Sequence, residues 1–515
     1  MSRFFNTTGP CDAGRHYMLP PTVRLPSVTR LVERDQYFVI HAARQTGKTT
    51  AVRAFAEALR AQGTVAVHAT LEASQGEEEV EAAEARWISA ILSAARSLPA
   101  TEQPPAAPAA PPGHRFATLL EAWANALQPR RLVLFLDEAD VVTGPALVNL
   151  LRQLRSGFHN RPARFPASVA LVGMRDLRDY LARAKDGAMV NPGSPFNIKA
   201  ESITLRNFTQ AEVADLYGQH AADTGQHFTP EAVARAYHWS RGQPFLVNKL
   251  AGTCVDEIVS DPSVPVRAEH IDAAKDAMVL SRTTHLHNLA ARLDEPRVAA
   301  VISRVLGGDD DVPGGDDLDY CIDLGLLDPV ARPASIANPL YREVVARELA
   351  LRAQDNLVLP RAPWKRVDGT LDAPVLVHTF LDWWRENSAF ALRNTPDGYH
   401  EATVLLAFMA FLQKVINGGG QVYREFAAGT GRVDLCVEIA GQRTAIELKR
   451  VRPGRESPER VLREGQAQLL GYLDTLGLRE GWLLVFDLRP GLSWDERMWA
   501  REVEIDGRLL HFRGA

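Results

Sequence analysis

Apolar and polar positions in the first 205 residues alternate between two patterns. Apolar runs suited to buried parallel strands are separated by stretches with the spacing of amphipathic helices. The expected strands are 37–40, 64–71, 132–136 and 168–172, and the expected helices are 49–61, 82–98 and 116–127. Strands that alternate with helices predict a parallel α/β sheet. Residues 99–113 hold too much proline for regular structure and are expected to form a flexible surface excursion.

After Thr209 the pattern becomes helical, with helices expected over 210–224, 230–240, 244–259 and 270–281. Residues 290–353 then follow the order helix, acidic loop, helix and short hairpin, which is the outline of a winged helix. Prolines mark a linker, and a last α/β unit ends in a hairpin with Asp506-Gly507 at its turn. The predicted parts are an α/β core (1–205), a helical lid (206–285), a winged helix (286–353), a linker (354–378) and an α/β unit (379–515).

Composition places the chain among ordinary globular proteins. Its 515 residues are enough for three or four domains, and 46% hydrophobic and 23% charged residues exclude wholesale disorder, collagen and a coiled-coil rod. The net charge of −5 gives no overall basicity that would indicate a nucleic-acid partner. Lysine is scarce, because eight of the 58 basic residues are lysines and the rest are arginines. The position of each lysine is therefore informative.

The cysteines and the apolar runs bear on the cellular compartment of the protein. The four cysteines are scattered without a C-x-x-C pair, which argues against a structural zinc site or a disulfide framework and fits a reducing environment. The first residues lack an apolar signal core, and no apolar run approaches the roughly 18 residues of a membrane span. We therefore expect a cytoplasmic protein with no membrane partner.

A phosphate-binding loop is predicted between the first strand and the first helix. Residues 42–49 read Ala-Ala-Arg-Gln-Thr-Gly-Lys-Thr, the G-x-x-x-x-G-K-T pattern with alanine at its first position. Alanine is tolerated there if its φ is not positive. Backbone N–H groups of such a loop attract phosphates, Lys48 would reach the β- and γ-phosphates, and Thr49 would bind Mg²⁺. The predicted nucleotide contacts are Ala43, Arg44, Gln45, Thr46, Gly47, Lys48, Thr49 and Thr50.

Two carboxylates follow the apolar run 132–136. Asp137 is suited to the Mg²⁺ shell, and Glu138 is suited to polarise the attacking water. A strand that ends by coincidence in an acidic turn is the alternative. The combination with the loop favours a P-loop ATPase with ATP and Mg²⁺ as cofactors.

Residues 16–256 resemble the AAA+/STAND ATPases, especially the archaeal-type ATPases found in bacteria and archaea. The resemblance rests on residues 41–50, 136–140, 172–176 and 242–244. It implies that Arg175 senses the γ-phosphate and that Pro244 lies near the adenine. Arg152 and Arg155 are candidate arginine fingers to a neighbouring subunit, or else part of a solvated basic helix face. Residues 288–353 look like the winged helix that commonly follows such lids.

A second charged cluster is predicted near the C-terminus. Asp434 lies on one alternating strand, and Glu447 and Lys449 lie two positions apart on the next, so the latter two share a face. If the strands form a hairpin, Asp434 can join them. Two carboxylates and a lysine on one face are costly to bury without ions. A surface hairpin with an ordinary Glu/Lys pair is the alternative.

The spacing D-x₁₂-E-x-K resembles that of the PD-(D/E)XK nucleases over about residues 395–490. The resemblance implies a restriction-endonuclease-like α/β fold in which Asp434 and Glu447 bind Mg²⁺, or Mn²⁺, and Lys449 positions the attacking water. It also implies supporting roles for Glu401 on the preceding helix and for Gln468 and Tyr472 on the following one. Val433 stands where the family usually has proline.

Two arginine-rich stretches, 152–183 and 449–464, have the charge that a groove for nucleic-acid phosphates needs, although each is equally explained as a solvated helix face. The acidic loop at 309–319 disfavours DNA binding by the winged helix and favours a protein–protein or autoinhibitory role.

The leading hypothesis is an ATPase that controls Mg²⁺-dependent cleavage of DNA by its C-terminal domain, with prokaryotic defence or mobile-element biology as a setting suggested by resemblance only. The alternatives are a STAND-like ATP switch whose nuclease-like domain only binds nucleic acid or a partner, and a DNA-remodelling motor that oligomerises. The expected partner is nucleic acid, with DNA favoured. A homo-oligomer and a protein trigger both remain open.

Overall fold

The computed structural model describes residues 3–106, 109–174, 199–280, 284–307, 312, 314–354, 364, 366, 370–393, 408, 411–412, 421–428, 431–439, 441–451, 457–487, 489 and 491–515. The chain divides into two compact units. The N-terminal unit comprises residues 1–282, 319–327 and 337–339, and the C-terminal unit comprises 283–318, 328–336 and 340–515.

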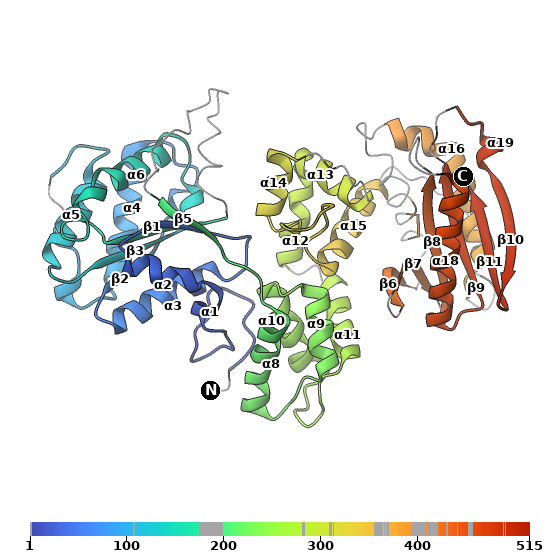
Figure 1. Cartoon of the computed structure of the whole chain (residues 1–515), viewed down its shortest axis with the longest axis horizontal. Coiled ribbons are helices and arrows are strands. Elements are labelled where there is room, and N and C mark those ends of the chain that lie inside the picture. The colour runs from blue at the N-terminus through green and yellow to red at the C-terminus, as the bar shows by residue number, and fades with distance from the viewer. Residues whose placement is uncertain are drawn as a thin grey trace. The chain divides into compact units, whose positions relative to one another are not determined.

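The N-terminal unit contains a five-stranded parallel sheet with the order β2-β3-β4-β1-β5 (Figure 1). Its strands are β1 (Tyr37–His41), β2 (Val65–Thr70), β3 (Leu132–Asp137), β4 (Ser168–Gly173) and β5 (Lys199–Thr204). This confirms the predicted parallel α/β sheet and four of its strands. The fifth was not predicted as a separate strand, because β5 lies at the edge of the described sheet beside β1 and carries polar residues instead of an apolar run.

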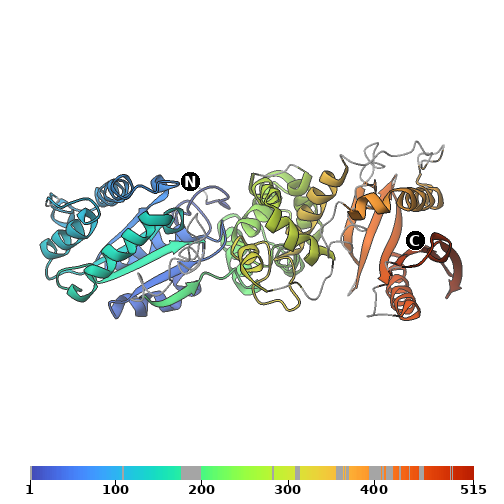
Figure 2. The same ribbon diagram turned by 90° about the horizontal axis from the view of Figure 1, so that it is seen from above.

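Helices cover both faces of this sheet (Figure 2). They are α2 (Pro26–Glu33), α3 (Lys48–Ala61), α4 (Val80–Ala95), α5 (Arg115–Ala126) and α6 (Gly144–Ser156). Alternate residues of β1 enter different cores: Phe38 packs with α2 and α3, and Val39 packs with α4, α5 and α6. This period-two division explains why the strand reads as continuously apolar in the sequence.

Hydrogen bonds anchor both ends of the proline-containing stretch 99–113, and its flexibility stays a prediction. Near its start lies the short turn η2 (Ala100–Glu102), where Trp123 Nε1 donates a 2.8 Å hydrogen bond to the Glu102 carbonyl. At its end, the fully buried Glu84 carboxylate accepts hydrogen bonds from the Gly113 and Phe116 N–H groups at 2.7 and 3.0 Å. A buried carboxylate needs such donors, so the α4 residue holds the start of α5 in place.

The predicted lid contains α8 (Gln210–Thr224), α9 (Pro230–Ser240), α10 (Pro244–Thr253) and α11 (Ala268–Leu280), and its role as a lid stays a prediction. Side-chain caps explain where the first three begin: Thr209, Thr229 and Gln243 each accept a backbone N–H of the following first turn. The predicted helix 244–259 is regular only to Thr253 and continues as the π-helical turn η5 (Cys254–Ile258).

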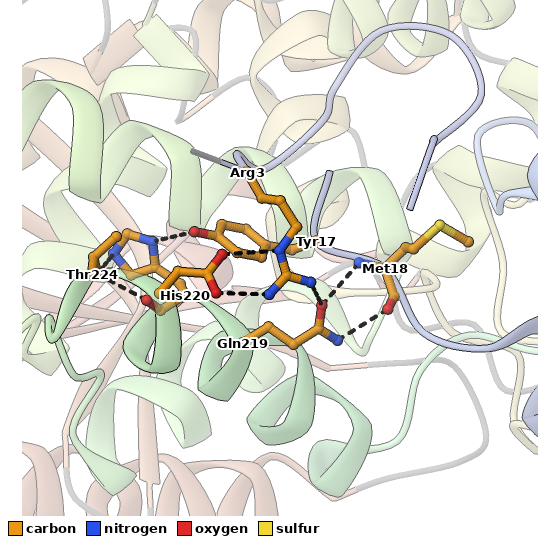
Figure 3. A network of polar contacts seen from close by, with 7 residues as sticks. Arg3, Tyr17, Met18, Gln219, His220 and Thr224 are labelled. Atoms are coloured by element: carbon orange, nitrogen blue, oxygen red, sulfur yellow. Dashed lines mark hydrogen bonds and ion pairs between the residues drawn. The ribbon is translucent and has the colours of Figure 1, made fainter. Parts of the chain in front are cut away.

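The two ends of an N-terminal segment, residues 3–19, contact α8 (Figure 3). The polar contacts join Arg3 to Asp223, Met18 to Gln219 and Tyr17 to His220. The Arg3 guanidinium donates two hydrogen bonds of 2.9 Å to the Asp223 carboxylate. Phe5 adds ring contacts to Tyr217, at 5.6 Å between centroids, and to His220, at 5.5 Å. The segment is therefore tied to the lid by both polar and aromatic contacts.

The region between the lid and the C-terminal sheet is helical. It contains α12 (Thr284–Ala291), α13 (Pro296–Gly307), α14 (Asp316–Asp323) and α15 (Pro339–Gln354). Before α15, the Ala337 N–H donates to the Leu326 carbonyl and the Asp328 N–H donates to the Ser335 carbonyl, both at 2.9 Å. This element order is the one expected for a winged helix, and the assignment itself stays a prediction.

The C-terminal unit contains a six-stranded mixed sheet with the order β10-β11-β9-β8-β7-β6. Its strands are β6 (Gln421–Ala428), β7 (Gly431–Ile439), β8 (Gln442–Val451), β9 (Glu480–Asp487), β10 (Trp499–Ile505) and β11 (Arg508–Gly514). The β10–β11 hairpin turns at Asp506 and Gly507, with φ of 51° and 72°, as the sequence predicts. The mixed sheet confirms a second α/β unit, whereas a restriction-endonuclease-like fold stays a prediction.

Two long helices, α16 (Ala373–Arg393) and α18 (Pro458–Leu476), pack on opposite faces of this sheet. Val485 of β9 lies in the core with α18, and Phe486 contacts Trp384 of α16 at 5.7 Å between centroids. Helix α16 starts inside the expected linker, because the Asp372 side chain accepts the Val375 N–H and Pro374 fits a first helical turn. Of the helices that the structure describes, none combines the length and apolarity needed to cross a membrane.

Candidate functional site

The predicted phosphate loop connects the end of β1 to the start of α3. Gly47 caps α3 with a φ of 88°, a conformation that glycine adopts without strain, and Gln45 has a φ of 58°. Ala42 is not among the described residues with positive φ, so the alanine in place of the usual glycine meets its condition. No side chain caps the first turn of α3, which leaves its N–H groups available to phosphate oxygens.

Lys48 is buried, with 7% of its surface exposed. Its ammonium donates to the carbonyls of Ala42 at 2.8 Å and Ala43 at 3.0 Å. Burial lowers the pKa of Lys48, while the carboxylates of Glu138 and Asp140 act against that shift. The cation is thus held inside the loop by backbone oxygens, next to the carboxylates after β3.

Asp137 and Thr49 meet at the carboxyl edge of the sheet. The Thr49 hydroxyl donates to Asp137 Oδ2 at 2.7 Å, His68 Nε2 lies 3.1 Å from the same oxygen, and the Glu138 N–H donates to Oδ1 at 3.0 Å. Burial would raise the pKa of Asp137, but the hydrogen bonds from His68 and Thr49 lower it overall. A hydroxyl and a carboxylate in contact are oxygen donors of the kind that Mg²⁺ prefers, so these residues fit the predicted Mg²⁺.

Glu138 stands at the point where the chain leaves β3 in a left-handed conformation, with φ 54° and ψ 36°. Burial raises the pKa of Glu138, and the neighbouring Asp140 and Asp137 carboxylates raise it further. Gly173 at the end of β4 gives Asp140 its room, because a Cβ there would lie 2.7 Å from Asp140 Oδ1. A half-buried carboxylate with a raised pKa in strained backbone is typical of a functional base.

The lid brings the predicted motif 242–244 next to the loop. Gln243 Nε2 donates to the Gln45 carbonyl at 3.4 Å, and Pro244 begins α10 as a buried residue. The predicted γ-phosphate sensor Arg175 lies outside the described residues. Arg152 and Arg155 lie exposed on α6.

Two side chains near the loop were not predicted from the sequence. His68 is one, and its place two residues before the end of β2 was the available signal. Arg24 is the other: its Nη2 donates to the Thr46 carbonyl at 2.9 Å and its Nε donates to the Arg206 carbonyl at 3.0 Å. No sequence motif marks Arg24, because its partners are backbone carbonyls far away in the chain.

In the C-terminal unit, Glu447 and Lys449 are neighbours on β8 as predicted. Lys449 Nζ lies 2.7 Å from Glu447 Oε1, and the two side chains are 22% and 2% exposed. Gly465 of α18 packs beside the Lys449 stem, since a Cβ there would lie 3.0 Å from Lys449 Cγ. The pair therefore lies on the face of the sheet that α18 covers.

The remaining predicted members of this cluster are only partly described. Leu435 of β7 pairs with Ile446 of the antiparallel strand β8. Asp434 comes directly before Leu435, and Glu447 comes directly after Ile446. The backbone register therefore places Asp434 beside the Glu447–Lys449 pair. Its side chain and all of Glu401 lie outside the described part of the structure. On α18, Tyr472 is buried and Gln468 is exposed.

The arginine-rich stretch after β8 is partly neutralised. Arg460 Nε lies 2.7 Å from Glu464 Oε1, and both side chains are more than half exposed, at 65% and 55%. Arg452 and Arg455 lie outside the described residues. A solvated helix face and a phosphate-binding surface both remain open for this stretch.

Residues 31–181 match the AAA domain family. Similar solved structures include a Walker-type ATPase of Pyrococcus abyssi, at 13% identity and a TM-score of 0.46 over 66% of this chain and 99% of that one. The Holliday junction branch migration motor RuvB of Thermotoga maritima has 13% identity and a TM-score of 0.35 over 63% and 92% of the two chains. The AAA domain of FIGL-1 in complex with ADP has 13% identity and a TM-score of 0.29 over 50% and 77%. No curated protein sequence matches. The family match and the geometry around Lys48 and Asp137 together identify this part of the chain as a P-loop ATPase domain of the AAA type.

Proposed function

We propose that ATP binding and hydrolysis by the AAA domain control Mg²⁺-dependent cleavage of phosphodiester bonds in DNA by the C-terminal unit. One observation carries the proposal: the Glu447 side chain is 2% exposed and lies 2.7 Å from Lys449 Nζ on the same sheet face. A buried ion pair adds little net stability, because the cost of desolvating both charges offsets their attraction, so function is a stronger reason for this placement than stability.

In the AAA domain, each chain group has a role that follows from its position. The N–H groups of the loop and the Lys48 ammonium bind the phosphates. Thr49 and Asp137 would hold Mg²⁺, which neutralises charge on the transferring phosphate when bound. Glu138 would accept a proton from the attacking water, and burial, which raises its pKa, makes this carboxylate a stronger base.

In the C-terminal unit, Glu447 and Asp434 would hold Mg²⁺, or Mn²⁺, which activates water and stabilises the charge of the phosphodiester transition state when bound. Lys449 would position that water through its ammonium. Because Lys449 Nζ is already 2.7 Å from Glu447 Oε1, this cation sits beside the oxygen that would bind the metal.

Coupling between the two activities would be a population shift. ATP can change the activity of the C-terminal unit only if it binds two arrangements of the chain with different affinity. A nucleic-acid or protein trigger, or assembly into a homo-oligomer, would act on the same equilibrium.

The test is cleavage of supercoiled plasmid DNA by the purified full chain with Mg²⁺, with and without ATP. Lys449→Ala and Glu447→Gln should abolish cleavage. In Lys48→Ala, cleavage should no longer depend on ATP. Glu438→Gln is the matched control: it weakens the partly exposed ion pair of 2.9 Å between Glu438 of β7 and Arg443 of β8, and it should leave cleavage unchanged.

The proposal would be contradicted if no substrate is cleaved. The substrates are plasmid DNA, linear DNA, single-stranded DNA and RNA, each tested with Mg²⁺ or Mn²⁺ and with and without ATP. Cleavage of RNA alone would contradict the choice of DNA. If Lys48→Ala abolishes the cellular function while Asp434→Asn preserves it, the C-terminal unit acts as a binding module of an ATP switch. Light scattering with and without ATP separates an oligomeric motor from a monomeric switch.

A further inference from the structure

The backbone carbonyls of the phosphate loop accept hydrogen bonds from several directions. Three of the described hydrogen bonds come from the loop and the start of α3: Lys48 Nζ donates to the Ala42 and Ala43 carbonyls, and Thr46 Oγ1 donates to the Ala43 carbonyl. Further along the loop, the Gln45 carbonyl accepts from Gln243 Nε2, and the Thr46 carbonyl accepts from Arg24 Nη2. The Gly47 carbonyl accepts the Ala51 N–H of α3. Two of these donors, Arg24 and Gln243, come from outside the loop and its helix.

These two donors fix the direction of two loop amides. In a trans peptide the C=O of one residue and the N–H of the next point in opposite directions. Holding the Gln45 carbonyl therefore aims the Thr46 N–H away from Gln243, and holding the Thr46 carbonyl aims the Gly47 N–H away from Arg24. Amides aimed together into a concave loop are what binds phosphate.

Arg24 also contacts the connection between the sheet and the lid. It ends the short helix α1 (Pro21–Arg24), and its Nε donates to the Arg206 carbonyl at 3.0 Å. The guanidinium carbon lies 4.7 Å from the centroid of Phe208, whose N–H donates to the Gly242 carbonyl at 2.8 Å. One planar side chain thus joins the phosphate loop to the hinge segment, residues 205–208, that leads into α8.

The chemistry of this contact requires arginine. Arg24 is 9% exposed, and burial lowers its pKa to about 10, with the Glu212 carboxylate acting against that shift. The side chain therefore stays charged at neutral pH, although burying a cation is costly. Its fork reaches two carbonyls in fixed directions, which the single ammonium of lysine does not reproduce.

We propose that Arg24 and Gln243 are positioning residues that orient the phosphate loop for ATP, and that Arg24 links this orientation to the hinge segment. Both act through the Thr46 and Gln45 carbonyls and not by touching phosphate. The proposal depends on the ATP-binding role of the AAA domain and is independent of any nuclease activity.

The test measures the Kd of a fluorescent ATP analogue for the full chain without DNA, together with the melting temperature. Arg24→Met should raise the Kd about tenfold or more, and a tenfold change corresponds to about 1.4 kcal/mol of binding free energy. Arg24→Lys should lie between Arg24→Met and the wild type, and Gln243→Ala should also bind more weakly. Arg3→Met is the control, because it removes the Arg3–Asp223 pair on the lid and leaves the loop contacts in place, so its Kd should equal that of the wild type.

A double variant separates positioning from a general structural role. Arg24 and Gln243 hold adjacent peptides of one loop, so their effects should be coupled. The change in Kd of the double variant, Arg24→Lys with Gln243→Ala, should therefore differ from the product of the changes in Kd of the two single variants. If the two effects multiply, or if Arg24→Lys binds as the wild type does with only its melting temperature lowered, the proposal is overturned. These two variants decide the question even if Arg24→Met does not fold.

Discussion

The Thr49 hydroxyl donates a 2.7 Å hydrogen bond to Asp137 Oδ2 across 88 residues of sequence. The loop after β1 and the end of β3 thereby join at one edge of the sheet, with His68 of β2 at 3.1 Å from the same oxygen. Three segments of the chain converge on one carboxylate oxygen, which places Asp137 at the centre of the proposed nucleotide site.

We expect Asp137→Asn to fold normally, because an amide oxygen can still accept the Thr49 hydroxyl. Loss of the negative charge should reduce ATP hydrolysis by about 100-fold or more, the usual size for a removed charge-stabilising group. Phosphate release measured across a Mg²⁺ titration is the readout. Binding of ATP in EDTA should not change, and Asp223→Asn on the lid surface should behave as the wild type. Wild-type hydrolysis in Asp137→Asn would show that Asp137 does not serve Mg²⁺.

Gly465 allows α18 to approach β8 and β9 closely. A Cβ at this position would lie 2.8 Å from Leu483 Cδ1 and 3.0 Å from Lys449 Cγ, so Gly465→Ala should destabilise the C-terminal unit by about 1–3 kcal/mol through overpacking. The displaced Lys449 should also reduce any cleavage activity. Gly471→Ala is the control on the same helix, since a Cβ there meets nothing within 4 Å and should add about 0.5–1 kcal/mol. Equal denaturation midpoints for the two variants would contradict this account.

Gly242 and Gly225 both have positive φ, at 73° and 81°, but differ in their surroundings. Alanine at either position costs about 1–2 kcal/mol for the left-handed backbone. At Gly242 the new Cβ would also lie 1.8 Å from the Phe208 carbonyl oxygen, whereas at Gly225 it meets nothing within 4 Å. We therefore expect Gly242→Ala to lower the melting temperature more and to weaken ATP binding by moving the hinge segment. Calorimetry with and without ATP checks both, and a similar response of the two variants would refute the packing argument.

His285 should make the stability of the C-terminal unit depend on pH. It lies in α12 with Nε2 2.6 Å from the Tyr341 hydroxyl, and burial lowers its pKa to about 4 from an ordinary value near 6.5. Between these values the unfolded chain binds a proton that the folded chain does not, so stability falls as the pH drops from about 6.5 to 4 and is unaffected above. At about 1.4 kcal/mol for each pH unit, the loss approaches about 3 kcal/mol.

Calorimetry at pH 7.5 and pH 5 measures this loss. His285→Gln can keep a hydrogen bond to Tyr341 without titrating, so it should lose less stability at pH 5 than the wild type. His378→Gln is the control, because that side chain is 77% exposed. A wild-type pH response in His285→Gln would assign the effect to other groups.

The sequence alone determined the elements that depend on neighbouring residues. Apolar runs predicted four strands of the parallel sheet, and the loop after β1 followed from its spacing of glycine, lysine and threonine. The period of two along a strand correctly placed Glu447 beside Lys449. In each case the partners lie within a few residues of one another, so local geometry is sufficient.

Only the tertiary structure decided which distant groups complete the site. The edge strand β5 has no apolar run, and pairing with β1 is what makes it a strand. His68 reaches Asp137 because β2 and β3 are parallel neighbours in register. Arg24 reaches Thr46 and Arg206 through backbone carbonyls, which every residue carries, so no side-chain pattern in the sequence could identify its partners.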